Sequence, residues 1–97
     1  MTDMRTFKWS IEKERMLQEL DSRNGINFAD CVVAVDEGRI LGILPHPRRK
    51  HQQLLVLDIE NYAYVVPFVV EEDGSVFLKT VYPSRKLTRM YLAGEKL

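Results

Sequence analysis

The stretch "QLLVLDIENYAYVVPFVV" (53–70) decides the fold, because it predicts two long apolar strands joined by a tight turn. Residues 53–59 have apolar side chains on both sides of the strand, which is typical of a central strand covered on both faces of a sheet. Glu60 and Asn61 follow as the turn, and residues 62–70 form the longest predicted strand. Two such strands joined by so short a connection predict an antiparallel hairpin.

Further strands are expected on either side of this hairpin. Pro67 interrupts the long strand and predicts a bulge or an edge-facing position there, because proline has no N–H for a sheet ladder. Asp73 and Gly74 are a strong turn dipeptide, and the last strand follows at "VFLKTVY" (76–82). A shorter strand precedes the hairpin at "RILGILPH" (39–46). The four strands together predict a meandering antiparallel sheet.

Three helices are expected outside the sheet. Ser10 can cap a helix that runs to about Ser22, and Asn27 can cap a second that ends near residues 36–38. Ser84 can cap a third helix at the end of the chain. The order of elements is therefore α-α-β-β-β-β-α, an α+β fold with two N-terminal helices, a four-stranded antiparallel meander and a C-terminal helix.

Apolar residues at helical spacing mark the helix faces that are expected to join the core. In the first helix these residues are Ile11, Met16, Leu17 and Leu20. In the second helix they are Phe28, Cys31, Val32 and Val35. Cys31 is the single cysteine, so an internal disulfide is excluded and a buried, unreactive thiol is expected.

Length and composition indicate one folded domain over residues 1–97, with 45% hydrophobic residues. No apolar run approaches the about 18 residues of a membrane-spanning helix. The first residues lack the apolar segment of a signal peptide, so a cytoplasmic protein without a membrane partner is expected. Histidines and carboxylates form no compact ligand set, so neither a metal nor another cofactor is expected.

The net charge is zero, but the charges are segregated along the chain. One window without acids lies between Glu37 and Asp58, and it contains Arg39, Arg48, Arg49 and Lys50. Another lies between Asp73 and Glu95, and it contains Lys79, Arg85, Lys86 and Arg89. If the two windows meet in space, the protein has a positive face despite its neutral total.

Two cations, Arg85 and Lys86, fall in the first turn of the last helix, where the helix dipole disfavours positive charge. Their position is explained if an anion such as a phosphate binds there. The alternative is that both side chains extend into solvent at negligible cost. Arg89 lies one helical turn beyond Arg85 and adds charge to the same face.

Other side chains in the basic windows suit phosphate chemistry. RNA cleavage by 2′-OH attack needs a base, an acid and cations, and Lys79 or Tyr82 can serve in proton transfer. Strand alternation puts Tyr82 on the opposite side from Lys79 unless the strand bends. His51, at the mouth of a strand beside the basic cluster, is the preferred histidine, and His46 is expected to be a turn residue. The alternative for Lys79 and Arg89 is an ion pair with the acids of "EED" or of the first helix.

Three segments resemble the BrnT-type toxins, a branch of the RelE-like ribonucleases. "FKWSIEK" is similar to their opening Phe-x-Trp-Asp-x-x-Lys, and "RNGINFADCV" is similar to their Lys-His-Gly-(Val/Ile)-x-Phe-x-x-Ala segment. "FLKTVYPSRKLTRMYL" is similar to their closing Ile-Ser-Ala-Arg-Lys-Ala-Thr segment. The resemblance spans about Phe7 to Tyr91, and the expected order of elements is also that of the family.

The resemblance implies the toxin half of a bacterial type II toxin–antitoxin pair. Such a protein cleaves RNA without a metal, and a small antitoxin neutralises it. DNA is then contacted only through the antitoxin. The toxin itself would form a homodimer or a toxin–antitoxin hetero-oligomer. In this sequence Asn24 stands where the family has histidine, Ser10 stands where it has aspartate, and Pro83 interrupts its Ser-Ala-Arg run.

The resemblance and the basic windows together suggest a set of site residues. Arg85 and Lys86 match the Arg-Lys of the family's last helix and would hold the scissile phosphate. Lys79 and Arg89 would add charge, and the second window would contribute Arg48, Arg49 and His51. Tyr82 and Tyr91 would stack on a base or assist proton transfer. Lys13 matches the lysine of the family's first helix.

Two other functions remain open from the sequence. A non-catalytic RelE-like binding protein would keep the fold and act through a protein partner. The apolar strand at 62–70 and the neutral total charge favour it, because both suit a protein-binding surface. A structural subunit of a larger assembly is a weaker alternative.

Overall fold

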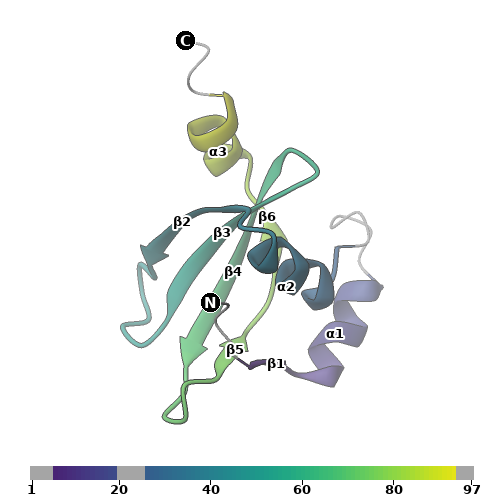
Figure 1. Ribbon diagram of the computed structural model, residues 1–97, viewed down its shortest axis with the longest axis vertical. Helices are drawn as coiled ribbons and strands as arrows, with labels where there is room; N and C mark the ends of the chain where they lie inside the picture. Colours follow the sequence, from purple (N-terminus) through teal and green to yellow (C-terminus); the bar gives the residue numbers. More distant parts are fainter. Residues whose placement is uncertain (1–5, 20–25, 94–97) are drawn as a thin grey trace.

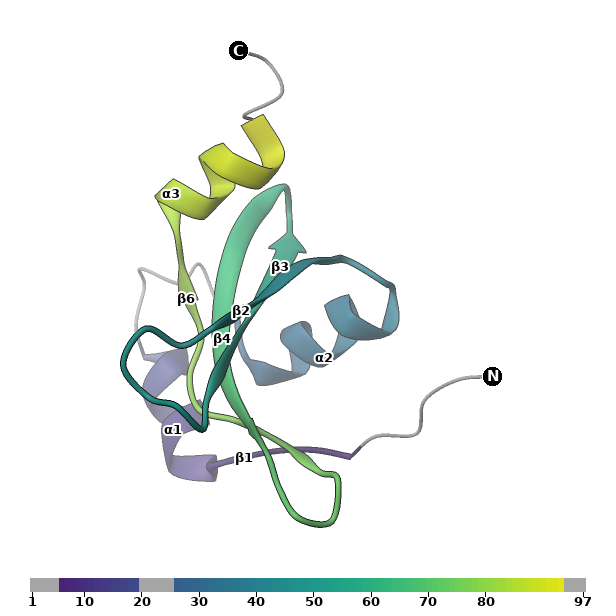
Figure 2. The same cartoon turned by 90° about the vertical axis from the view of Figure 1, so that its left-hand side faces the viewer.

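The computed structural model describes residues 6–19 and 26–93, which form an α+β fold with a mixed sheet (Figure 1). The helix α2 packs on one face of the sheet, and α3 lies beyond one end of it in both views (Figures 1 and 2). The elements in chain order are β1 (Phe7–Trp9), α1 (Ile11–Gln18), α2 (Phe28–Asp36), β2 (Ile40–Pro45), β3 (Gln53–Ile59), β4 (Tyr62–Val70), β5 (Val76–Leu78), β6 (Tyr82–Pro83), α3 (Arg85–Thr88) and the π-helical turn η2 (Arg89–Ala93). None of the described helices is long and apolar enough to span a membrane.

The sheet differs in part from the predicted four-stranded antiparallel meander. The pairs β2–β3, β3–β4 and β4–β5 are antiparallel, as expected. The sheet has six strands, however, because β1 pairs in parallel with β5 and the last predicted strand is divided into β5 and β6. β1 has only three residues, and its Trp9 ring stacks on Phe28 at a centroid distance of 5.6 Å. Such a short strand depends on distant contacts, so no local pattern predicts it.

Both predicted hairpin turns are confirmed. Glu60 and Asn61 have φ angles of 56° and 66°, the paired positive values of the two-residue turn that suits the twist of a hairpin. The Asp58 carboxylate accepts a hydrogen bond from the Asn61 N–H at 3.0 Å. In the β4–β5 turn, Asp73 accepts one from the Ser75 N–H at 2.8 Å. Hydrogen bonds from the Ser75 side chain and backbone hold the pKa of the Asp73 carboxyl below its ordinary value.

A β-bulge divides β5 from β6. Phe68 pairs with Leu78, and Val65 pairs with Tyr82. Between these two pairs β4 contributes two residues, whereas the facing segment contributes three, residues 79–81. One extra residue on one strand is the defining feature of a bulge.

Pro67 lies opposite the bulge, as its position in the strand predicted. Its carbonyl accepts a hydrogen bond from the Lys79 N–H at 2.8 Å. The N and the carbonyl of a residue in an antiparallel strand point to the same side, so the nitrogen of Pro67 also faces the bulge. The ladder is already interrupted at this place, and the missing N–H therefore leaves no ladder bond broken.

The bulge reverses the alternation of side chains after Lys79. Leu78 and Val81 are both in the core, with exposed fractions of 1% and 0%. Lys79 and Tyr82 are both exposed. The prediction that Tyr82 points to the opposite side from Lys79 was therefore wrong, because the extra residue shifts the period by one.

The first helix begins as predicted but does not bury the predicted face. The Ser10 hydroxyl accepts a hydrogen bond from the Lys13 N–H at 3.2 Å. Ile11 and Met16 are 74% and 55% exposed, so their assignment to the core was wrong. A polar contact joins α1 to α2 instead, with the Phe28 N–H donating to a Glu14 carboxylate oxygen at 3.2 Å. The predicted helix end at Ser22 and the predicted core residue Leu20 lie outside the described residues, as does the side chain of Leu17.

The second helix confirms its predicted cap and apolar stripe. The Asn27 side chain accepts from the Asp30 N–H at 2.9 Å, and the Asp30 carboxylate accepts from the Asn27 N–H at 3.0 Å. Phe28 and Cys31 are buried, while the stripe's two valines are partly buried against the same cluster. Burial, with a smaller contribution from the Asp30 and Glu14 carboxylates, raises the pKa of the Cys31 thiol to about 12.

The start of the C-terminal helix is bonded to the central strand β4 through Ser84 and Thr88: the Ser84 N–H donates to the Ala63 carbonyl at 3.0 Å. Ser84 caps α3, accepting from the Leu87 N–H at 3.1 Å, as predicted. The Thr88 hydroxyl donates to the Ser84 carbonyl at 2.7 Å and accepts from the Ala63 N–H of β4 at 2.8 Å. Ala63 is fully buried, so the threonine satisfies a backbone donor that water does not reach.

Replacing Thr88 by valine is expected to destabilise the fold, because the buried Ala63 N–H loses its acceptor. A buried donor left unpaired costs about 1–3 kcal/mol of the free energy of unfolding. Thr88→Ser keeps the hydroxyl and is the matched control, with a smaller loss. Urea denaturation of the three proteins measures this, and equal stability of Thr88→Val and Thr88→Ser would contradict the bridging role.

The Cys31 thiol is expected to make stability fall at alkaline pH. An unfolded chain releases a thiol proton at about pH 8.5, whereas the folded state retains it up to about pH 12. The contribution of the protonated thiol to the free energy of unfolding is therefore complete below pH 8.5 and is lost as pH rises toward 12. Between pH 7 and pH 10 wild-type protein should lose more free energy of unfolding than Cys31→Ala. Equal losses in the two proteins would show that the thiol does not contribute.

Candidate functional site

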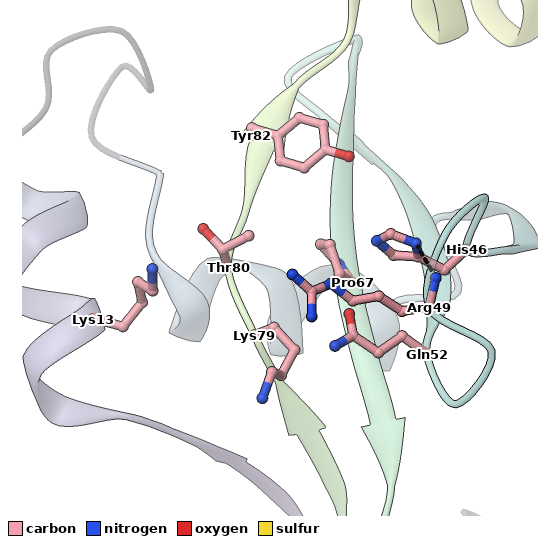
Figure 3. A pocket seen from close by; sticks show the side chains of 8 residues that line it. All are labelled: Lys13, His46, Arg49, Gln52, Pro67, Lys79, Thr80 and Tyr82. Atoms are coloured by element: carbon pink, nitrogen blue, oxygen red, sulfur yellow. Dashed lines mark hydrogen bonds between the residues drawn. The ribbon is translucent and has the colours of Figure 1, made fainter.

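A concave pocket of about 410 Å³ lies where three parts of the chain meet β4 (Figure 3). One wall comes from α1, a second from the β2–β3 connection, and a third from the bulge between β5 and β6. Its lining residues are Lys13, His46, Arg49, Gln52, Pro67, Lys79, Thr80 and Tyr82.

The pocket is positively charged although the whole chain is neutral. Three of its lining residues are the cations Lys13, Arg49 and Lys79. No carboxylate is among the described residues that line it. The two basic windows of the sequence thus meet here through Arg49 and Lys79, and a concave site lined by one sign of charge concentrates counter-ions.

The bulge forms one wall of the pocket. Because of the reversed alternation, Lys79, Thr80 and Tyr82 all line it. The Lys79 ammonium lies 5.1 Å from the centroid of the Phe77 ring, a cation–π contact that holds this side chain at one margin of the pocket (Figure 3). Figure 3 shows the Tyr82 hydroxyl turned toward the side of the pocket that carries His46.

The alternative that Lys79 pairs with the acids of the β4–β5 turn was wrong for the described residues. Glu71 and Asp73 are instead within 3.3 Å and 3.8 Å of the Lys8 ammonium on β1. The parallel strand β1, absent from the prediction, brings Lys8 to that turn. Within the part of the chain that the structure describes, Lys79 forms no ion pair, and its ammonium lies over the Phe77 ring instead.

His46 organises the loop that forms the second wall. Its Nδ1 accepts two backbone hydrogen bonds, from the N–H groups of Arg48 and Arg49, each at 3.0 Å. The Gln52 N–H donates to the Arg49 carbonyl at 3.0 Å, and the His46 N–H donates to the Gln52 carbonyl at 3.3 Å. An Nδ1 that accepts hydrogen bonds carries no proton, so the hydrogen of the neutral ring is on Nε2. Figure 3 shows that second nitrogen facing the pocket.

Sequence reasoning preferred His51, but His46 is the histidine that lines this pocket. His51 is exposed and is not among the lining residues, whereas His46 is half-buried and lines the pocket. A usable signal was present in "HPRRKHQ": a side-chain acceptor at the first position of a loop can bind N–H groups two and three residues later, as Asn and Asp do in turns. Gln52, which sequence reasoning also missed, closes the same loop.

The other predicted site residues lie outside the pocket lining. Arg85, Lys86 and Arg89 are exposed on α3 and η2, and Arg48 is exposed on the loop. Tyr91 packs on β2: a Cβ at Gly42 would stand 2.7 Å from its hydroxyl, which explains the glycine there. Asn24, at the position of the family's histidine, lies outside the described residues.

The arrangement suits an anion. The Arg49 guanidinium can form two parallel hydrogen bonds to phosphate oxygens, while Lys13 and Lys79 contribute point charges. The ring of His46 offers an N–H and Tyr82 a hydroxyl. Among the described residues, no three side chains of the types that bind metals gather in one place. The cationic pocket, composed of the eight lining residues, is therefore the candidate functional site.

Inorganic pyrophosphate is expected to bind the cationic pocket in preference to the start of α3. In ¹H–¹⁵N NMR titrations at low salt, the backbone signals of Arg49 and Thr80 should shift most. Binding should weaken at least tenfold in Arg49→Ala/Lys79→Ala and change little in Arg85→Ala/Lys86→Ala, which removes the same charge. Shifts concentrated on α3 would contradict the assignment.

Comparisons of this chain with protein-family models, with curated proteins and with solved structures found no match. The resemblance to BrnT-type toxins therefore rests on the three sequence segments alone, and the functional argument rests on the geometry of the cationic pocket.

Proposed function

We propose that the chain is the toxin of a BrnT/RelE-like type II toxin–antitoxin pair, a metal-independent endoribonuclease that acts in the cytoplasm. The observation that supports this most is the composition of the cationic pocket. Three cations, an imidazole N–H and a phenolic hydroxyl surround one concavity, and no described carboxylate lines it. RNA phosphodiesters are the anions that such a set can both bind and cleave.

The chemistry is the attack of a ribose 2′-OH on the adjacent phosphorus. A 2′-O–P bond forms, the P–O5′ bond breaks, one proton leaves the 2′-OH, and one proton is taken up by the 5′-oxygen. Arg49 would bind the two non-bridging oxygens, whose charge grows as the phosphorane forms, and Lys13 and Lys79 would stabilise that negative charge electrostatically. Tyr82 and Lys79 are the lining side chains suited to proton transfer.

The exposed cations of the C-terminal helix fit a longer RNA. Arg85 follows Tyr82 by only three residues, so a strand with one phosphate in the pocket could continue along α3. Lys86 and Arg89 would then contact flanking phosphates, and Tyr82 would stack on an unpaired base. In this proposal the scissile phosphate lies at Arg49 and the α3 cations contribute affinity.

A non-catalytic binding protein is the second candidate, and exposed apolar side chains favour it. Ile40 and Ile43, on the outer strand β2, are 40% and 53% exposed, and Val33 on α2 is 53% exposed. An edge strand with apolar side chains suits pairing with another protein. The partner would be the cognate antitoxin, in a hetero-oligomer that reaches DNA only through the antitoxin, or a second copy of the chain. The antitoxin would bind whether or not the chain cleaves RNA.

Induced expression in bacteria tests the ribonuclease. Wild-type protein is expected to arrest growth and degrade RNA, and Arg49→Ala/Lys79→Ala to abolish both. Removal of one such electrostatic contact typically lowers the rate by about 10²–10³. Arg85→Ala/Lys86→Ala is the comparison variant: it removes the same charge from α3, so it should weaken RNA binding but still allow cleavage. Circular dichroism verifies that each variant is folded.

Two outcomes would count against the proposal in different ways. Normal growth and intact RNA with wild-type protein would favour the non-catalytic binding protein. RNA degradation that survives Arg49→Ala/Lys79→Ala but is lost in Arg85→Ala/Lys86→Ala would place the chemistry at α3 instead of the cationic pocket.

A further inference from the structure

We propose that His46 acts as a neutral hydrogen-bond donor to a phosphate oxygen, and that it does not transfer a proton. The inference rests on the proposed function, since it concerns the same phosphodiester in the same pocket. It departs from the usual role of a histidine beside a scissile phosphate, which is that of a general acid or base.

The hydrogen bonds of the loop determine where the imidazole carries its hydrogen. Nδ1 accepts from two backbone N–H groups, those of Arg48 and Arg49, at 3.0 Å each. Both donors are backbone groups in a loop closed by the Arg49–Gln52 and His46–Gln52 hydrogen bonds. They cannot turn away without opening the loop. The tautomer with hydrogen on Nε2 is therefore built into the native conformation.

This tautomer excludes both kinds of proton transfer in the loop as it is folded. Nε2 already carries hydrogen and has no free lone pair, so it cannot act as a base. Loss of that hydrogen from a neutral ring would leave an imidazolide anion. A general acid would need the imidazolium form, in which an Nδ1–H would point at the N–H groups of Arg48 and Arg49. Three donors would then face one another without an acceptor.

The remaining role of Nε2–H is to hold an oxyanion. Nε2 faces the pocket, whose lining also includes the cations Lys13, Arg49 and Lys79 and the hydroxyl of Tyr82 (Figure 3). His46 and Arg49 belong to one loop, and Nδ1 fixes the backbone from which the Arg49 side chain extends. The His46 ring thus positions two phosphate-binding groups, its own Nε2–H and the Arg49 guanidinium, before the ligand binds. Donors that are already in place stabilise developing charge without reorganisation.

The tautomer is measured first, in the free protein. Long-range ¹H–¹⁵N NMR spectra distinguish protonated from unprotonated ring nitrogens. The expected result at neutral pH is an unprotonated Nδ1 and an Nε2–H for His46, with His51 as the internal reference for an exposed ring. An Nδ1–H tautomer or an imidazolium at His46 would overturn the proposal, whatever the protein does to RNA.

A pair of variants separates the donor from the loop anchor. In His46→Asn the amide oxygen can accept from the two backbone N–H groups, but no donor reaches the pocket. In His46→Ala both functions are lost. Binding is measured with a single-stranded RNA whose 2′-hydroxyls are methylated, so that it cannot be cleaved. His46→Asn should keep the loop signals of Arg48 and Arg49 in place and bind about tenfold more weakly, as expected for one hydrogen bond to a charged group.

The outcomes distinguish this inference from the proposed function. Wild-type affinity in a well-folded His46→Asn would overturn the donor role. If wild-type protein cleaves RNA, the pH profile of cleavage should keep its shape in His46→Asn, and loss of one limb would show proton transfer by His46. If wild-type protein binds the methylated RNA but cleaves no RNA, the catalytic proposal fails, and the affinity comparison still tests the donor. Absence of RNA binding by wild-type protein would overturn both.

Discussion

The missing N–H of Pro67 is the constraint on which the site depends. A proline in a central strand interrupts the ladder with the neighbouring strand, and the facing segment has one extra residue there. That bulge sends Val81 into the core and Tyr82 to the outside, next to Lys79. A regular strand would put Val81 in the pocket wall and Tyr82 in the core. The same local irregularity therefore closes the apolar core and forms one wall of the cationic pocket.

The opposite wall has its own source of rigidity. The β2–β3 connection contains no regular secondary structure, and its conformation is held by the His46 ring and the Gln52 backbone. Arg49 extends from this closed loop toward the bulge (Figure 3). The β2–β3 connection and the bulge between β5 and β6 thus face each other across β4. Both are held by hydrogen bonds, and this arrangement is more typical of a preorganised anion site than of an adaptable surface. Two acids of the β4–β5 turn, Glu71 and Asp73, are paired to Lys8 on β1 and do not line the pocket.

Features governed by local interactions were predictable from the sequence. The caps at Ser10, Asn27 and Ser84 and the turn at Glu60–Asn61 depend on neighbours within a few residues. Pro67 by itself indicated that the ladder of its strand is interrupted. The face of the sheet on which the Tyr82 side chain lies was not predictable, because the position of a bulge depends on how the two strands pair. The parallel strand β1 and the exposure of Met16 also depend on distant contacts. For the same reason sequence reasoning selected Lys13, Arg49, Lys79 and Tyr82 but could not separate them from the cations of α3.

The proposed ribonuclease function requires that the cationic pocket binds the phosphate at which RNA is cleaved. A crystal structure of the protein with a short RNA, methylated at its 2′-hydroxyls to prevent cleavage, tests this most directly. We expect one phosphate in the pocket, with two oxygens on the Arg49 guanidinium and one within hydrogen-bond distance of His46 Nε2. An RNA whose phosphates contact only Arg85 and Lys86 on α3, with the pocket unoccupied, would contradict it.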